Sequence, residues 1–93
     1  MISSFADRAT LAIFRGVYVK SVDPALPRKA RQKLLMIDAA IRITDLLVPP
    51  GNRLERLIGD RNDQHSIRVN DQWRICFVWR DDSAHDVELV DYH

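Results

Sequence analysis

The residues from Trp73 to Arg80 alternate strictly between large apolar side chains and other residues, and this pattern constrains the fold more than any other part of the chain. A period of two is typical of a β-strand with one buried face, because successive side chains of a strand point to opposite faces of the sheet. Arg74 lies on the face opposite the apolar one. The large apolar positions, which predict a sheet face packed on the core, are Trp73, Ile75, Phe77 and Trp79.

Further strands are expected on both sides of this one. Residues 66–69 alternate as well, and the polar residues 70–72 between the two runs predict a tight connection, so the two runs should form a hairpin. Residues 81–83 predict a second turn, which leads into a strand over residues 87–90. The chain from Leu54 onward therefore predicts three or four mostly antiparallel strands.

The first half of the chain has helical patterns instead. Asp7 is a typical N-cap for a short helix over residues 8–15, and Gly16 is a typical C-terminal glycine. Residues 1–5 before it are candidates for a short strand. Pro27 can begin a second helix, which residues 49–51 (Pro-Pro-Gly) cannot continue. The apolar face expected for this helix consists of Ala30, Leu34, Ile37 and Ile41.

Two helices followed by a small sheet predict an α+β fold. With 93 residues, of which 46% are apolar, the chain predicts a single domain over residues 1–93. Cys76 is the only cysteine, so no internal disulfide is possible. No secretory signal and no apolar run long enough to cross a membrane is visible, so we expect a cytoplasmic protein without a membrane role.

The charges are distributed unevenly along the chain. Residues 1–80 hold all 14 Lys and Arg and 8 of the 13 acids, a net charge of +6, and residues 81–93 hold the other 5 acids, a net charge of −5. Affinity for a polyanion grows with the number of phosphates neutralised, so a body of this charge binds nucleic acid only weakly. The asymmetry fits either ordinary surface charge or a modest phosphate-binding face.

Common cofactor and metal motifs are missing. The sequence has no Gly-rich phosphate loop, no paired-cysteine spacing and no His-Glu-x-x-His. The three histidines, His65, His85 and His93, lie on separate segments, and although folding can bring them near acids, we predict no metal and no cofactor.

The chain ends in Asp91, Tyr92 and His93, three side chains that can orient, donate and exchange protons. An imidazole titrates near neutral pH and suits general acid or base catalysis. The α-carboxylate of His93 favours the protonated ring, and therefore an acid role. Taken alone, the tripeptide favours a frayed terminus over a functional one.

A family resemblance adds to this interpretation. The segment GDRNDQHSIRVNDQWRICF (residues 59–77) resembles the sheet region of HigB-type toxins of the RelE/ParE superfamily, as do PPGNRLERL (residues 49–57) and VDYH (residues 90–93). The resemblance implies a type II toxin that cuts mRNA in the ribosomal A site and is held inactive by a HigA-like helix-turn-helix antitoxin, through which alone it would meet DNA. It also implies a fold of two N-terminal helices packed on a small twisted, mostly antiparallel sheet.

The resemblance also implies a catalytic set. Asp91, Tyr92 and His93 match the C-terminal catalytic run of the family, and Arg74 matches the central-strand arginine that faces the scissile phosphate. Glu55 stands where related YoeB toxins carry a glutamate, their proposed general base, and where the best-studied HigB has a histidine. The identity of the base therefore stays open.

RNA supplies its own nucleophile, so these residues need only manage protons and charge. Glu55 would take the 2′-OH proton, Arg74 would stabilise the charge on the phosphate, and His93 would protonate the leaving 5′ oxygen. Asp91 would orient His93, and Tyr92 would stack on a base or bind a phosphate oxygen. The candidates for RNA contacts are Arg53, Arg56, Arg61, His65 and Arg68; for His65 a structural hydrogen bond is an equal alternative.

Two other classes remain open from the sequence. ParE-like members of the superfamily poison gyrase without cutting RNA. A non-catalytic module that binds an antitoxin and tunes repression of its operon is the second alternative.

Overall fold

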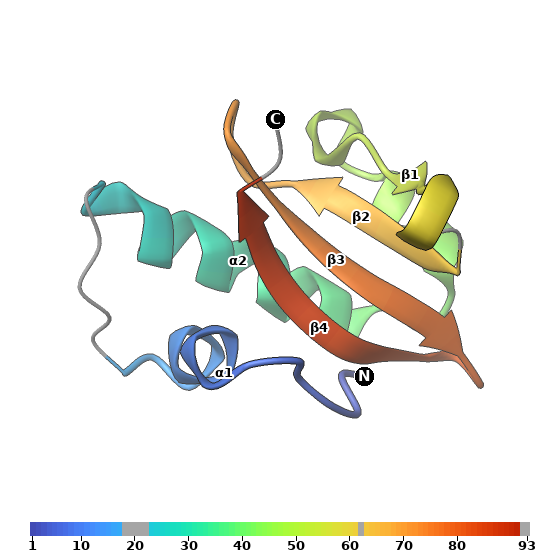
Figure 1. The fold of residues 1–93 in the computed structure, drawn as a ribbon, viewed down its shortest axis with the longest axis horizontal. Helices are drawn as coiled ribbons and strands as arrows, with labels where there is room; N and C mark the ends of the chain where they lie inside the picture. Colours follow the sequence, from blue (N-terminus) through green and yellow to red (C-terminus); the bar gives the residue numbers. More distant parts are fainter. Residues whose placement is uncertain (18–22, 62, 92–93) are drawn as a thin grey trace.

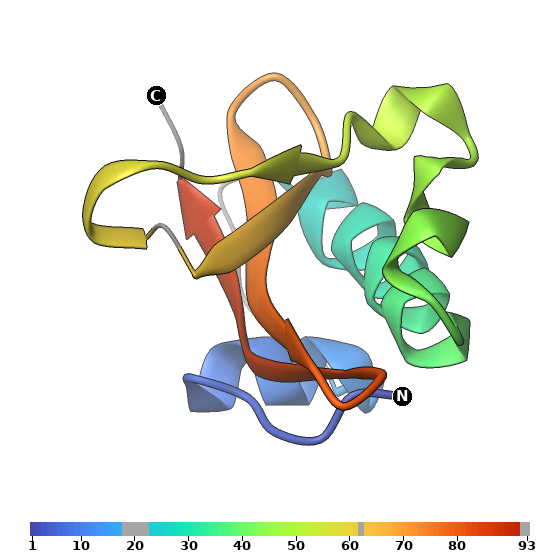
Figure 2. The ribbon, with the colours of Figure 1, turned by 90° about the vertical axis from the view of Figure 1, so that its right-hand side faces the viewer.

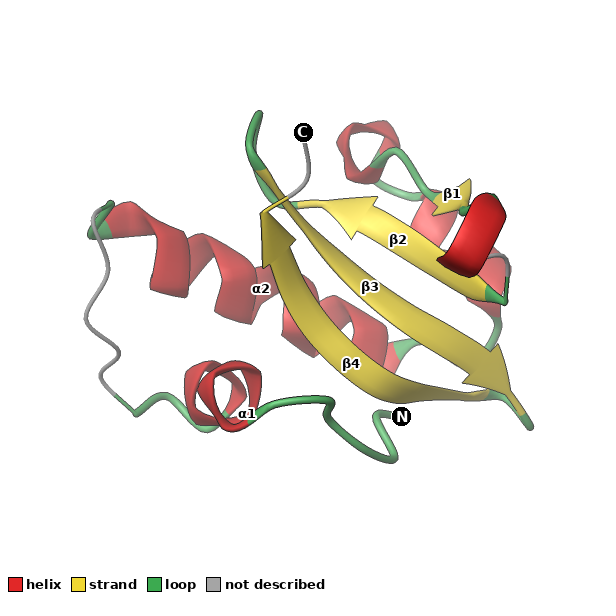
Figure 3. Cartoon of the chain, viewed as in Figure 1, coloured by secondary structure: helices red, strands yellow, loops and turns green. Residues whose placement is uncertain are grey.

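The computed structural model describes residues 1–17, 23–61 and 63–91 and has an α+β fold (Figure 1). The helices are α1 (Arg8–Phe14) and α2 (Ala25–Ala39), and the strands are β1 (Glu55–Arg56), β2 (Gln64–Arg68), β3 (Trp73–Arg80) and β4 (Ser83–Asp91). Three short 3-10 helices, η1 (Ile43–Leu47), η2 (Pro50–Asn52) and η3 (Gly59–Arg61), lie in the connections. The strands form one sheet in the order β1-β2-β3-β4, with every neighbouring pair antiparallel. The predicted fold class is thus confirmed (Figure 3).

The two faces of the sheet have different neighbours. Helix α2 lies behind one face, α1 lies beside the edge formed by β4, and η3 lies in front of the other face (Figures 1 and 2). The core fills the space between α2 and the sheet, where Leu34, Ile37, Ile75 and Phe77 are all 0% exposed. Trp73 and Trp79 pack against this core, as their alternation with Arg74 predicts. The face in front, called the open face below, is the one available for a site.

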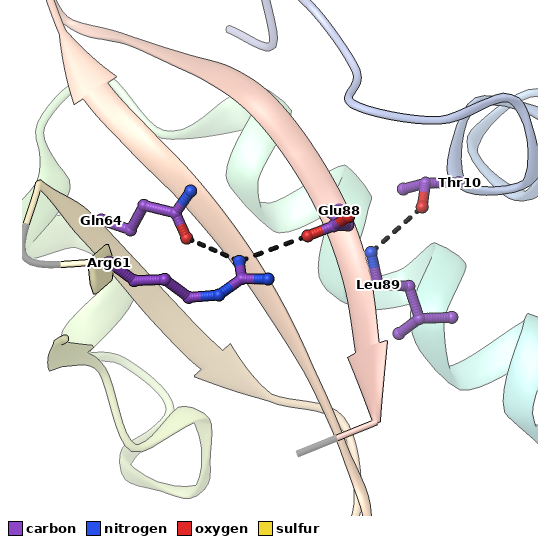
Figure 4. Close-up of polar contacts among 5 residues, drawn as sticks. All are labelled: Thr10, Arg61, Gln64, Glu88 and Leu89. Atoms are coloured by element: carbon purple, nitrogen blue, oxygen red, sulfur yellow. Dashed lines mark hydrogen bonds and ion pairs between the residues drawn. The ribbon is translucent and has the colours of Figure 1, made fainter. Parts of the chain in front are cut away.

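The capping signals of the first helix are confirmed. The Asp7 Oδ1 accepts a hydrogen bond from the N–H of Thr10 at 2.6 Å, and Gly16 follows the helix with a positive φ of 77°. Thr10 is buried, and its Oγ1 accepts from the N–H of Leu89 at 3.0 Å (Figure 4). Helix α1 is therefore held against β4 by a side chain in its own first turn.

Several boundaries differ from the sequence-based expectation. Helix α2 begins at Ala25 and ends at Ala39, so Ile41 lies outside it and is 74% exposed instead of sharing the core face. The Asp45 carboxylate accepts from the N–H groups of Ile41 and Arg42 at 2.9 and 3.0 Å, and this cap starts η1 where the helix would have continued.

The N-terminal residues and β4 differ from the expectation as well. Residues 1–5 form no strand; they make only isolated parallel bridges, Ile2 with Ala84 and Phe5 with Val87. Strand β4 begins at Ser83, earlier than expected, because Asp81 and Asp82 both have positive φ (54° and 58°) and close a two-residue hairpin turn.

The predicted hairpin of β2 and β3 is confirmed. Its connection is held by Asn70, whose Oδ1 accepts from the N–H groups of Gln72 and Trp73 at 2.9 and 2.8 Å. Within the described ranges, no helix is long and apolar enough to cross a membrane.

Candidate functional site

The strand register places the polar residues of three strands on the open face. Arg74 pairs with Arg68 across β2 and β3, Ser66 pairs with Cys76, and Glu55 of β1 pairs with Ser66. Directly paired residues share one face of a sheet, and that face is opposite the one that carries Phe77. The alternation that buries the apolar residues of β3 therefore also gathers these polar side chains.

An open pocket lies on this face, at the end of the sheet where the turn between β2 and β3 meets the loop before β1. Its volume is about 430 Å³, and its walls are mostly charged. The residues that line it are Arg53, Glu55, Arg68, Asn70, Asp71 and Arg74. Three guanidinium groups against two carboxylates suit a phosphate-sized anion.

Arg74 forms the floor of the pocket and is 8% exposed. Its Nε donates to the Oγ of Ser66 at 2.8 Å, and its Nη2 donates to the carbonyl oxygens of Arg53 at 2.6 Å and Ser66 at 3.3 Å. All of these bonds use Nε or Nη2, so Nη1 has no hydrogen-bond partner among the described residues. The guanidinium is thus fixed by neutral acceptors while the two N–H groups of Nη1 stay available for an anion.

Glu55 stands beside Arg74 at the rim. One carboxylate oxygen, Oε2, lies 4.0 Å from Nη2 of Arg74, at the outer limit of an ion pair, and the side chain is 56% exposed. A carboxylate held loosely beside an arginine keeps its oxygens accessible, so Glu55 can accept a proton from a molecule bound in the pocket.

Arg68 and Arg61 also lie on the open face. Arg68 forms an ion pair with the exposed carboxylate of Asp71 in the pocket wall. Arg61 reaches across the sheet farther along, where its Nη1 donates to Gln64 at 2.9 Å and Glu88 at 3.3 Å (Figure 4). Beside Arg61, Cys76 is fully buried, and burial raises the pKa of its thiol, so it behaves as a small apolar residue.

Two other predicted contact residues face away from the pocket. His65 pairs with Phe77 and Arg56 in the register, and its ring stacks on that of Phe77 with centroids 6.4 Å apart. Burial, together with the guanidinium of Arg56, lowers the pKa of His65. Its buried Nδ1 has no hydrogen-bond partner among the residues that the structure describes. His65 and Arg56 are therefore not brought together with Arg74.

The C-terminal candidates are only partly described. Asp91 pairs with Trp73, on the face opposite Arg74, and its Oδ2 accepts from Nε2 of Gln72 at 3.0 Å. Tyr92 and His93 lie outside the described residues. Asp91 is not among the described residues that line the pocket.

Sequence reasoning missed three residues of the site. Ser66 holds the Arg74 guanidinium, and Asn70 and Asp71 line the pocket, although their segment predicted only a turn. The alternation in β2 could have predicted the position of Ser66. Ile67 belongs to the apolar face, so its neighbour Ser66 must point to the opposite face.

Comparisons with known proteins agree with this architecture. The model of the HigB-like toxin family, described as RelE-like toxin of type II toxin–antitoxin system HigB, matches residues 4–93. The chain belongs to the HigB-like toxin family. It is 47% identical to Toxin HigB-1 of Vibrio cholerae over 64 residues, which are 69% of this chain and 63% of that protein.

Two other similarities extend the comparison. An uncharacterized protein of Haemophilus influenzae is 40% identical over 58 residues, 62% of this chain and 57% of that protein. This HigB-like chain thus aligns with about six tenths of the length of the curated relatives it matches. A chain of the YoeB-YefM complex from Staphylococcus aureus shares the fold, with a TM-score of 0.63 and 16% identity over 100% of this chain and 98% of that one.

Proposed function

We propose that this HigB-like protein is the toxin of a type II toxin–antitoxin module and acts as a metal-independent endoribonuclease on mRNA in the ribosomal A site. The observation that carries the proposal is the pocket in which Arg74, buried and held by neutral acceptors, lies beside the exposed carboxylate of Glu55. One group can stabilise a phosphate and the other can accept a proton, which are the two tasks that cleavage at a 2′-OH requires.

In the proposed reaction the 2′-oxygen attacks the neighbouring phosphorus, and the bond from phosphorus to the 5′-oxygen breaks. Glu55 takes the proton of the 2′-OH, and Arg74 stabilises the negative charge on the phosphate oxygens through the N–H groups of Nη1. His93 gives a proton to the leaving 5′-oxygen, so the products are a 2′,3′-cyclic phosphate and a 5′-OH. Asp91 orients His93, and Tyr92 contacts a base or a phosphate.

Contacts to the rest of the RNA are proposed for the arginines of the open face. Arg53 and Arg68 line the pocket beside Arg74, and Arg61 lies farther along the sheet, so the three define a path for a strand across the face. Three such contacts give weak, salt-dependent binding, and this supports a substrate presented by the ribosome instead of free RNA. We further propose that the protein acts in the cytoplasm, where ribosomes translate mRNA, and that a HigA-like antitoxin controls it.

The test uses ribosomes programmed with an mRNA that carries a single 2′-deoxy substitution at the cleaved position. Cleavage of the all-ribose message with a cyclic phosphate product, and no cleavage at the 2′-deoxy position, is the expected result. Toxicity without RNA cleavage would instead support a ParE-like toxin, and antitoxin binding without toxicity would support a co-repressor module.

Replacing Glu55 by Gln should lower the single-turnover cleavage rate by about 10²–10⁴-fold, because the amide has nearly the same shape but cannot accept the proton. Binding of a non-cleavable 2′-O-methyl RNA should not weaken, because the change removes a negative charge beside Arg74. Asp60→Asn, an exposed acid in η3, is the charge-matched control. A Glu55→Gln protein as fast as the parent would assign proton removal to another group.

Asp71 competes with RNA phosphate for Arg68 in this proposal. Asp71→Asn should tighten binding of the 2′-O-methyl RNA by about two- to fivefold at low salt, and the gain should shrink as salt increases. Fluorescence anisotropy measures both. Asp81→Asn removes the same charge at the opposite end of the hairpin, at a positive φ that Asn tolerates. Equal affinities of the two variants would show that Asp71 does not oppose binding.

A further inference from the structure

Asn52 lies behind the pocket and has no part in the chemistry proposed above. It is 0% exposed although it is polar. Its Nδ2 donates to the carbonyl oxygens of Leu46 at 3.2 Å and Val48 at 3.5 Å, and its Oδ1 accepts from Nζ of Lys33 at 2.5 Å. Both ends of the amide are therefore used, which fixes it in one orientation.

The backbone around Asn52 shapes the pocket. Arg53, the next residue, has φ 45° and ψ 56°, a left-handed conformation that costs a non-glycine residue about 1 kcal/mol or more. In this conformation its carbonyl accepts from Nη2 of Arg74 at 2.6 Å, the shortest of the bonds that hold the guanidinium. Residues that keep Arg53 in this conformation therefore also keep Arg74 in place.

Lys33 connects this loop to the helix layer. It lies on α2 between Ala30 and Leu34. Both of these residues pack in the core, so the backbone of Lys33 is rigidly placed. Its ammonium is partly buried; burial, and to a smaller extent the charge of Arg68, lower the pKa of Lys33. A cation in such surroundings is unfavourable unless it is well hydrogen-bonded, and the acceptor it uses is Asn52.

We propose that Lys33 and Asn52 are positioning residues, which transmit the rigidity of α2 to the Arg53 carbonyl and thereby hold the Arg74 guanidinium for the phosphate. The kinetic consequence rests on the proposed nuclease function, whereas the chain of contacts from Lys33 to Arg74 can be tested without it. No atom of Lys33 or Asn52 touches the RNA in this proposal.

The test variant is Lys33→Met, which keeps the aliphatic stem and helix propensity but removes the ammonium that Asn52 accepts from. Lys29→Met, one helical turn earlier and exposed, removes the same charge from the same helix and is the matched control. Thermal unfolding of both proteins is measured first. If Lys33→Met does not fold, Lys33→Gln replaces it, because its polar end is one bond too short to reach Asn52.

Two readouts decide the outcome. In the free protein, the ¹⁵N signal of Arg74 Nε, assigned by its loss in Arg74→Gln, should shift or broaden in Lys33→Met and stay in place in Lys29→Met. On programmed ribosomes, the single-turnover rate at saturation should fall by about 10-fold in Lys33→Met, since small displacements of a catalytic group are costly, while the half-saturating concentration changes less than twofold.

An unchanged Arg74 signal in Lys33→Met overturns the proposal, and so does an unchanged saturating rate in a protein whose parent cleaves RNA. If the parent protein cleaves no RNA, the proposed function fails, and the Arg74 signal alone then decides whether Lys33 positions the guanidinium.

Discussion

Arg74→Gln should reduce mRNA cleavage on programmed ribosomes by about 10²–10³-fold, because the cation that meets the developing charge on the phosphate is lost. The effect should appear in the saturating rate, since the interaction is stronger in the transition state than in the bound substrate. The Arg74 side chain is also buried at the base of the open face, where the Oγ of Ser66 and the carbonyl of Arg53 accept its hydrogen bonds. We therefore expect a loss of about 1–3 kcal/mol in the free energy of unfolding.

Arg80→Gln is the control for this variant, because Arg80 is exposed at the other end of the same strand. It should cleave mRNA at the parent rate and unfold at the parent temperature. Circular dichroism at the assay temperature separates loss of chemistry from loss of fold. If the folded Arg74→Gln protein cleaves mRNA at a rate within threefold of the parent rate, the phosphate does not react in the pocket around Arg74.

Phe77→Ala should have the largest effect on stability. Phe77 is 0% exposed, and its ring meets those of His65 and Trp79 with centroids 6.4 Å away in each case. Loss of a buried aromatic ring costs about 3–5 kcal/mol, which is a large share of the roughly 5–15 kcal/mol that stabilise a small domain. Urea unfolding followed by circular dichroism measures the change.

Phe77→Leu leaves much of the apolar volume in place and should cost clearly less than Phe77→Ala. Leu35→Ala, on the exposed side of α2, should change the free energy of unfolding by less than about 1 kcal/mol. A loss below 1.5 kcal/mol in Phe77→Ala would mean that the core is not centred on β3.

The parts of the fold that were predicted correctly from the sequence are those specified by neighbouring residues. The Asp7 cap, the turn at residues 70–72 and the two-residue period of β3 each depend on a few adjacent side chains, and all are observed. The prediction that Ile41 shares the helical core face is wrong, because the apolar spacing continues past Ala39 whereas a cap from Asp45 redirects the backbone. Local pattern alone does not show which of two competing hydrogen-bond arrangements is the more stable.

The candidate site was less predictable because it depends on contacts between distant segments. The family resemblance implies Arg74 and Glu55 as site residues. In the structure, Nη2 of Arg74 lies 4.0 Å from Oε2 of Glu55. The support from Ser66 and from the Arg53 carbonyl follows from strand register and a left-handed backbone, neither of which a spacing rule predicts. The catalytic roles of Asp91, Tyr92 and His93 stay predictions.

The outer edge of β4 has a consequence for how other proteins can approach this domain. Ala84 and Val87 exchange backbone hydrogen bonds with residues 1–6, and the N–H of Leu89 donates to the Thr10 hydroxyl. An exposed edge strand invites pairing with strands of other chains, and here the domain's own first residues and α1 occupy that position. Growth of the sheet by strand addition beside β4 is thereby blocked between Ala84 and Leu89, which protects this edge against edge-to-edge aggregation, and a regulator that approaches here must bind side chains.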